Sequence, residues 1–308
     1  MAEKIATREA YGNALKALGE KNEKIVVLDA DLSGSTKTAV FAKAFPERFF
    51  DCGIAEANMT SMAAGMAACG KIPFISTFAV FGTGRNYDVI RSSICYPKLN
   101  VKLAMTHAGL TVGEDGATHQ SLEDIALMNA LPNMTVIVPA DAMQAEGAVF
   151  AAAEIEGPVY LRFSRAKTPV IYPEGHRFIP GKADIIKDGK DAAIFACGVM
   201  VSKAMEAAAA LSNEGIEAAV INISTIKPLD RQTVITYARK CGRVVTAEEH
   251  SVFGGLNSVI SQCLSEEYPV KVKAVAVKDV FGQSGKADEL MEYYALTAGE
   301  IVKAVKSF

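Results

Sequence analysis

Short apolar runs alternate with longer segments of helical spacing along the first half of the chain. Thr7 and Ser121 stand where N-caps of the first and fourth expected helices would fall. The apolar runs predict buried strands at 25–28, 49–52, 72–77, 101–105, 135–138 and 159–163. The segments between them predict helices at 8–18, 55–69, 86–96, 122–130 and 141–154. Because buried strands that alternate with helices form parallel sheets, this half predicts a mostly parallel sheet covered by helices.

The second half repeats the same rhythm after an interruption. Three prolines, Pro169, Pro173 and Pro180, fall between 164 and 181 and predict a linker. Strands are then expected at 192–196, 218–223, 244–247 and 272–277, and helices at 200–213, 230–240, 255–266 and 297–306. We therefore expect an α/β protein of two domains, each a mostly parallel sheet flanked by helices. The expected boundaries are 1–165 for the first domain, 166–183 for the linker and 184–308 for the second domain.

Composition narrows the classes of partner. The 308 residues carry a formal net charge of −3 and half of them are hydrophobic, which suits a large core and gives no basic patch for nucleic acid. The six cysteines include no CxxC pair, as is typical of reduced thiols. The first ten residues, MAEKIATREA, contain no apolar signal region, and no apolar run is long enough to span a bilayer. These features predict a cytoplasmic protein that binds neither nucleic acid nor membrane.

The stretch from Thr106 to Ser121 concentrates glycines and titratable groups. It reads THAGLTVGEDGATHQS and follows the strand expected at 101–105, so it leaves the edge of the sheet where open α/β proteins bind ligands. His107 and His119 bracket an acidic pair, and such histidines suit proton transfer on hydroxyl groups. A solvated turn is the alternative. A metal site built from His107, Asp115 and His119 is weaker, because the spacing matches no zinc signature.

Other candidate residues stand near neighbouring strand ends. Glu56 is the only charge in the helix expected at 55–69, and a buried carboxylate is costly unless it is paired. The alternative is a glutamate favoured by the positive end of the helix dipole. Phe78 and Phe81 follow the strand at 72–77 and either pack in the core or stack on a flat ligand. Arg165 lies just past the strand at 159–163, whereas we expect a structural role for His250, in a loop.

Together, six motifs resemble the thiamine diphosphate-dependent transketolases. Three in the first half resemble the pyrimidine-binding domain of that family: GIAEANM (53–59), STFAVFGTGRNYDVIR (76–91) and THAGLTVGEDGATHQ (106–120). Three in the second half resemble its C-terminal domain: TIKPLD (225–230), AEEHSVFGGL (247–256) and FGQSGKADEL (281–290). The resemblance implies transfer of a two-carbon ketol unit from a ketose phosphate to an aldose phosphate.

The resemblance also implies roles for individual residues. Glu56 matches the glutamate that hydrogen-bonds the aminopyrimidine ring and activates the cofactor, and Phe81 matches the aromatic that stacks on that ring, with Phe78 nearby. The flanking Ala55 and Ala57 depart from the bulky residues common in the family. Residues that contact sugar hydroxyls in the family are matched here by His107, Asp115 and His119. The resemblance also implies a catalytic role for the two histidines. Matches to positions that hold the sugar phosphate are Arg8, Ser35 and Arg165.

One part of the family pattern is missing from this sequence. Full-length transketolases begin with a domain that holds the diphosphate through a GDG motif, an asparagine and Mg²⁺, and no GDG occurs here. The chain therefore resembles the C-terminal subunit of a split transketolase. The resemblance implies a separate N-terminal subunit that supplies the Mg²⁺ ligands, with no metal ligand on this chain. It also implies a homodimer of this chain within a heterotetramer.

Four alternatives remain open at this point. The beta subunits of 2-oxo acid dehydrogenases share the two-domain plan but usually lack the motif at 106–120. Deoxyxylulose-phosphate synthases typically have Asp-Arg where this chain has Thr106-His107. A non-catalytic regulatory subunit is disfavoured by four retained residues, which are Glu56, His107, Asp115 and His119. A metal-dependent hydrolase would act without thiamine diphosphate.

Overall fold

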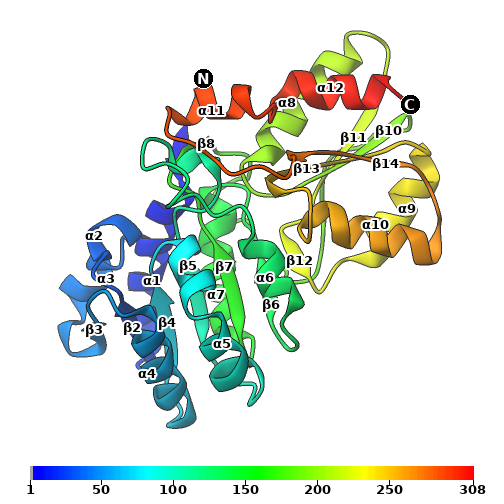
Figure 1. Ribbon diagram of the computed structural model, residues 1–308. Helices are drawn as coiled ribbons and strands as arrows, with labels where there is room; N and C mark the ends of the chain where they lie inside the picture. The colour runs from blue at the N-terminus through cyan, green and yellow to red at the C-terminus, as the bar shows by residue number, and fades with distance from the viewer. Residues whose placement is uncertain (1–2) are drawn as a thin grey trace.

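A seven-stranded sheet forms the centre of the first part of the molecule (Figure 1). The computed structural model describes residues 3–308. Neighbouring strands run parallel, except that the edge strand formed by Thr225–Lys227 is antiparallel to its neighbour. Their order across the sheet is β12 (Thr225–Lys227), β6 (Thr135–Ile137), β7 (Val159–Arg162), β5 (Lys102–Met105), β4 (Ile72–Ser76), β2 (Ile25–Asp29) and β3 (Phe49–Asp51).

Helices cover both faces of this sheet, and successive side chains of each strand pack on opposite faces. In β2, Val27 packs with the helices α1 (Thr7–Lys21) and α7 (Ala142–Glu154). Its neighbour Leu28 packs with α4 (Glu56–Ala68) and α6 (Asp124–Ala130) on the other face. The continuous apolar runs of the sequence therefore mark strands covered on both sides.

The second part has the same layered plan around five strands (Figure 1). Ile194 of β10 packs with α8 (Met200–Ser212) and α12 (Ala298–Lys306), while the next residue, Phe195, packs on the side of α9 (Arg231–Cys241) and α10 (Leu256–Glu267). Only β9 runs antiparallel to its neighbour. The strand order is β14 (Val272–Val277), β13 (Val244–Ser251), β10 (Ala192–Ala196), β11 (Ala218–Asn222) and β9 (Asp184–Lys187).

Short elements complete the structure. A two-stranded antiparallel pair joins β1 (Lys4–Ala6) to β8 (Lys167–Pro169). The short α-helices are α2 (Ser33–Thr36), α3 (Ala39–Ala44), α5 (Tyr87–Val89) and α11 (Ala287–Tyr293). Two π-helical stretches, η2 (Phe81–Arg85) and η3 (Ile90–Cys95), flank α5, and two 3₁₀ turns are η1 (Pro46–Arg48) and η4 (Leu110–Val112).

The two parts share a core and a strand. β12 follows β11 in the chain, yet it pairs with β6 at the edge of the first sheet. Lys227 of β12 donates from Nζ to the carbonyl oxygens of Asn129 and Leu131, at 2.9 Å and 2.7 Å. One apolar cluster contains residues of both sheets, among them Val26 and Phe195. The two parts are therefore held together by the pairing of β12 with β6 and by a shared apolar cluster, as well as by the linker.

The fold-class prediction is confirmed, whereas local details differ. Neither expected cap forms: the Thr7 hydroxyl lies 3.0 Å from the hydroxyl of Ser164, and the helix expected to follow Ser121 begins only at Asp124. His250 lies in strand β13, not in a loop, and is fully buried. The edge strands β9 and β12 and helix α11 were not predicted, because they are short and lack a sustained apolar run. Among residues 3–308, no helix has both the length and the apolar character needed to cross a membrane.

Candidate active site

The predicted site residues follow the carboxyl ends of adjacent strands. Ser35 follows β2, Phe78 follows β4, His107 follows β5 and Arg165 follows β7. These four strands are neighbours and parallel, so the segments after them meet at one edge of the sheet. Arg8 reaches the same edge from the first turn of α1, since its side chain contacts both Ser35 and His107.

A row of aromatic rings crosses this edge. The imidazole of His107 stacks on Phe78 with centroids 3.8 Å apart, and Phe78 lies parallel to Phe81 at 5.8 Å. His119 meets Phe81 edge-on at 5.3 Å. Phe78 is buried and Phe81 half-buried, so only Phe81 leaves ring surface for a flat ligand.

Arg85 links Glu56 to this row of rings. Glu56 begins α4, is 6% exposed, and accepts from Nη1 of Arg85 at 2.8 Å. The guanidinium of Arg85 also lies over the ring of Phe81, 4.0 Å from its centroid. Arg85 belongs to the π-helical stretch η2 and is half exposed, so it is the solvent-facing partner of the pair. In the sequence Glu56 is the only charge of its helix, whereas in the structure it is paired with Arg85 of η2.

The hydrogen bonds of His107 define its tautomer. Arg8 Nη1 donates to Nε2 of His107 at 3.0 Å, because a guanidinium has no acceptor. Nδ1 must then carry the proton and donate to the hydroxyl of Thr106 at 2.8 Å. Burial and, after it, the charges of Arg8 and Arg165 lower the pKa of His107 to about 3. His107 is therefore neutral at physiological pH, which suits a hydrogen-bonding role better than a role as general acid.

Positive charge gathers around His107. Burial and the charge of Arg165 lower the pKa of Arg8, and Lys37 adds to the same field at His107. Arg8 Nη1 also donates to the carbonyl oxygen of Ser35 at 2.9 Å, so this carbonyl helps to orient the guanidinium. Two arginines and a lysine around a neutral imidazole form a site suited to an anion such as a phosphate.

The loop that carries Ser35 is fixed by a buried carboxylate. Asp29 accepts from the amide of Leu32 at 2.6 Å and from the hydroxyls of Thr36 and Thr38 at 2.7 Å and 2.8 Å. Asp29 is fully buried, and this burial raises its pKa. The carboxylate thus closes the turn that offers the Ser35 carbonyl to Arg8.

The central loop uses its acids differently from the sequence-based expectation. Asp115 pairs with Nη1 of Arg165 at 3.3 Å, and Glu114 is exposed, so neither acid lies against a histidine. Arg165 Nη1 also donates to the carbonyl oxygen of Val112. His119 contacts the hydroxyl of Thr118 at 2.9 Å. Between residues 3 and 308, no group of three or more His, Cys, Asp or Glu side chains is placed to hold a metal ion, including the set His107, Asp115 and His119.

Comparison with known proteins identifies the family. Residues 3–170 match "Transketolase, pyrimidine binding domain" and residues 181–301 match "Transketolase, C-terminal domain". The "Putative transketolase C-terminal section" of Methanocaldococcus jannaschii is 48% identical over 97% of this chain and 94% of its own length. The "6-deoxy-6-sulfo-D-fructose transketolase subunit SqwH" of Clostridium sp. is 42% identical over 96% of this chain and 92% of its own length.

A solved structure agrees over nearly the whole length. The protein titled "Split gene transketolase, inactive beta4 tetramer" superposes with a TM-score of 0.91 and 56% identity, covering 99% of this chain and 98% of its own. The chain belongs to the transketolase family. Within that family it comprises the pyrimidine-binding and C-terminal domains, as the motifs predicted.

The shifted pKa of His107 leads to a prediction for stability. Between about pH 6.5 and pH 3 the unfolded chain binds a proton on this imidazole that the folded chain does not. The contribution of His107 to the free energy of unfolding should therefore fall with falling pH across this window, by at most about 1.4 kcal/mol per pH unit.

The His107→Asn variant tests this. Asparagine tolerates the positive φ of 56° at this position but does not titrate there. In denaturant unfolding at pH 7.5, 6.5, 5.5 and 4.5, the variant should lose less stability on acidification than the wild type. Parallel pH profiles for the two proteins would contradict the buried, neutral state of His107.

Proposed function

We propose that this chain is the C-terminal subunit of a transketolase. It would transfer a two-carbon ketol unit from a ketose phosphate to an aldose phosphate with thiamine diphosphate. The supporting observation is a single edge of the sheet with two ends of different chemistry. At one end Arg85 contacts both the buried carboxylate of Glu56 and the ring of Phe81, and at the other Arg8 and Arg165 surround neutral His107. An aminopyrimidine suits the first end and a sugar phosphate the second.

The residues at the cofactor end fit the aminopyrimidine of thiamine diphosphate. The cofactor, when bound, supplies the carbanion that cleaves and forms the carbon–carbon bond. Glu56 is buried and can hold a proton at a ring nitrogen, because exclusion of water strengthens such a hydrogen bond. Phe81 offers a half-buried face on which a pyrimidine can stack. Arg85 covers both groups in this structure, so its exposed side chain must move aside.

The sugar end fits a chain of hydroxyls that leads to a phosphate. His107, His119 and Asp115 are proposed to contact the hydroxyls, with His119 able to carry protons between them. Nε2 of His107 accepts from Arg8 in this structure and its Nδ1 proton is engaged with Thr106, so Nε2 can accept from a hydroxyl once Arg8 turns toward the phosphate. Arg8, Ser35 and Arg165 are proposed to hold the phosphate, the arginines through their N–H groups and Ser35 through its hydroxyl, while the Ser35 carbonyl oxygen orients Arg8.

A separate N-terminal subunit is proposed to supply the cradle for the diphosphate and the ligands of Mg²⁺. Two relatives support this, one named a transketolase C-terminal section and the other a split-gene transketolase whose beta4 tetramer is inactive. Both have nearly the same extent as this chain. We further propose a homodimer of this chain within a heterotetramer, because two-fold symmetric dimers are the commonest closed homo-oligomers.

A sulfonated sugar is a second candidate substrate. A relative 42% identical to this chain is named a 6-deoxy-6-sulfo-D-fructose transketolase subunit. Arg8 and Arg165 can pair with the oxygens of a sulfonate as well as those of a phosphate. Comparing the Michaelis constants for phosphorylated and sulfonated ketoses decides between the two.

Arg165→Ala should selectively weaken use of anionic sugars. Losing a charge-assisted contact costs about 1.5–3 kcal/mol, so the Michaelis constant for a phosphorylated acceptor should rise about tenfold or more. A non-phosphorylated acceptor should be affected far less. Arg177→Ala, at an exposed arginine of the linker, is the matched control. Equal losses on both acceptors would mean that Arg165 only supports the loop.

The purified chain alone should be inactive and should bind thiamine diphosphate weakly. A diphosphate needs several N–H or cationic partners together with a metal ion, which we assign to the other subunit. Ketol transfer should appear on addition of the N-terminal subunit, thiamine diphosphate and Mg²⁺. Full activity of the chain by itself, with mass spectrometry excluding a co-purified partner, would overturn the assignment.

A further inference from the structure

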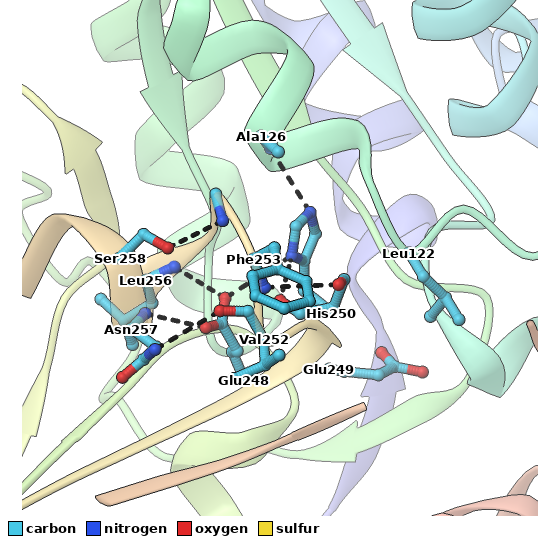
Figure 2. A network of polar contacts seen from close by, with 12 residues as sticks. Leu122, Ala126, Glu248, Glu249, His250, Val252, Phe253, Leu256, Asn257 and Ser258 are labelled. Carbon is cyan, nitrogen blue, oxygen red and sulfur yellow. Dashed lines mark hydrogen bonds and ion pairs between the residues drawn. The ribbon is translucent and has the colours of Figure 1, made fainter. Parts of the chain in front are cut away.

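Strand β13 of the second sheet carries three consecutive buried ionisable residues, Glu248, Glu249 and His250. Figure 2 shows that Glu248 and His250 belong to one polar network, whereas the carboxyl group of Glu249 points away from it, toward the side of Leu122. The pleat of the strand explains this alternation. The three residues therefore serve two different regions.

Glu248 and His250 have complete structural partners. Glu248 accepts from the amides of Leu256 and Asn257, at 2.7 Å and 2.8 Å, and so caps the start of α10 (Figure 2). His250 Nε2 accepts from the amide of Ala126 at 3.3 Å, and its Nδ1 lies 2.8 Å from the carbonyl oxygen of Ser251. Both residues stabilise the join between α6, β13 and α10, which agrees with the structural role predicted for His250.

Glu249 instead reaches the central loop. Its Oε1 accepts from the backbone amide of Thr111 at 2.6 Å, and its Oε2 has no hydrogen-bond partner among the described residues. The carboxyl group fills a notch above Gly109, where a Cβ atom would overlap it. Gly109 has φ +83°, a conformation that other residues resist. The loop is thus shaped to admit this one carboxyl group.

The contact leads directly to the proposed phosphate site. Thr111 is the middle residue of the 3₁₀ turn η4, and the next residue, Val112, accepts from Arg165 through its carbonyl oxygen. The same Nη1 of Arg165 contacts Asp115 at 3.3 Å. A single turn of backbone therefore joins Glu249 of the second domain to the guanidinium of Arg165.

We propose that Glu249 is a positioning residue for sugar-phosphate binding, holding η4 through the Thr111 amide so that Val112 aims Arg165 at the anion. This inference rests on the proposed function for the identity of the ligand. It gives the C-terminal domain an indirect part in substrate binding, through the central loop. A buried carboxyl group with one amide partner lowers the stability of the fold, so its presence at this position is better explained by a role in the site than by a contribution to stability. Burial raises the pKa of Glu249 to about 7, with Arg162 and Asp124 the nearby charged groups.

Three substitutions separate positioning from a general structural role. Glu249→Ala leaves the Thr111 amide without an acceptor, whereas Glu249→Gln keeps an amide oxygen in the same place. Glu248→Ala is the matched control, because it removes the neighbouring buried glutamate, which contacts α10 and not the loop. Glu249→Asp, which shortens the side chain by one methylene, replaces the alanine variant if that variant does not fold.

In the enzyme assembled with its N-terminal subunit, Glu249→Ala should raise the Michaelis constant for a phosphorylated acceptor up to about tenfold, the upper end of what one lost hydrogen bond costs. Turnover at saturation and the Michaelis constant for a non-phosphorylated acceptor should stay within about twofold. Glu249→Gln should restore wild-type values. With Arg165 already replaced by alanine, Glu249→Ala should add no further increase.

Hydrogen exchange provides a readout that needs no activity. By mass spectrometry, the segment 109–116 should lose protection in Glu249→Ala but keep it in Glu249→Gln and Glu248→Ala. If the wild-type enzyme transfers no ketol unit, the proposed function fails while this measurement still tests the link from Glu249 to the loop. Unchanged exchange in Glu249→Ala, or equal losses on both acceptors without rescue by glutamine, would overturn the positioning role.

Discussion

The buried ion pair between Arg162 and Asp124 is the contact on which the site depends. Arg162 donates from Nε to Asp124 at 2.7 Å, and from Nη2 to the carbonyl oxygens of Ser121 and Glu249 at 3.4 Å and 3.0 Å. Tyr160 donates to the same aspartate at 2.6 Å. Despite burial, Arg162 keeps the pKa of Asp124 below its ordinary value. Because removing one partner of a buried pair is strongly destabilising, these groups fix β7, α6, β13 and the end of the central loop together.

The central loop is consequently held from both domains. Arg162 fixes its end, the Glu249 carboxylate fixes its turn, and the side-chain amide of Gln120 donates to the carbonyl oxygen of Gln283 at 2.9 Å. The two proposed ends of the site then differ in how tightly they are built. At the sugar end Arg8 is joined to His107 by a hydrogen bond, whereas at the cofactor end the half-exposed Arg85 lies over Phe81.

Local pattern was sufficient to predict the main layers of the fold. The buried strands are continuous apolar runs, so their positions and the parallel arrangement were predictable. Edge strands such as β12 were not, because three residues carry no period and their partner lies far away in sequence. The predicted N-cap at Thr7 was wrong for a related reason. Its hydroxyl is hydrogen-bonded to the hydroxyl of Ser164, a residue far away in the sequence.

For the site, the motifs predicted which residues gather but not their pairing. His107 and Arg165 follow the ends of β5 and β7, and Arg8 reaches the same edge from the first turn of α1. The pairing of Asp115 with Arg165, of Glu56 with Arg85 and of Glu249 with Thr111 depends on tertiary distances. Arg85 carried a weak signal as a cation within the motif at 76–91. Glu249 and Asp124 carried none, since an acid in a strand or at a helix start is ordinarily solvated.

The central claim is that Glu56 of this chain activates a cofactor shared with another subunit. Exchange of the C2 proton of bound thiamine diphosphate with solvent deuterium tests it most directly, in the assembled enzyme carrying Glu56→Gln. With Glu47→Gln at an exposed position as the control, exchange in Glu56→Gln should slow about 10²–10⁴-fold with the cofactor still bound. Wild-type exchange in that variant, at full cofactor occupancy, would contradict the account.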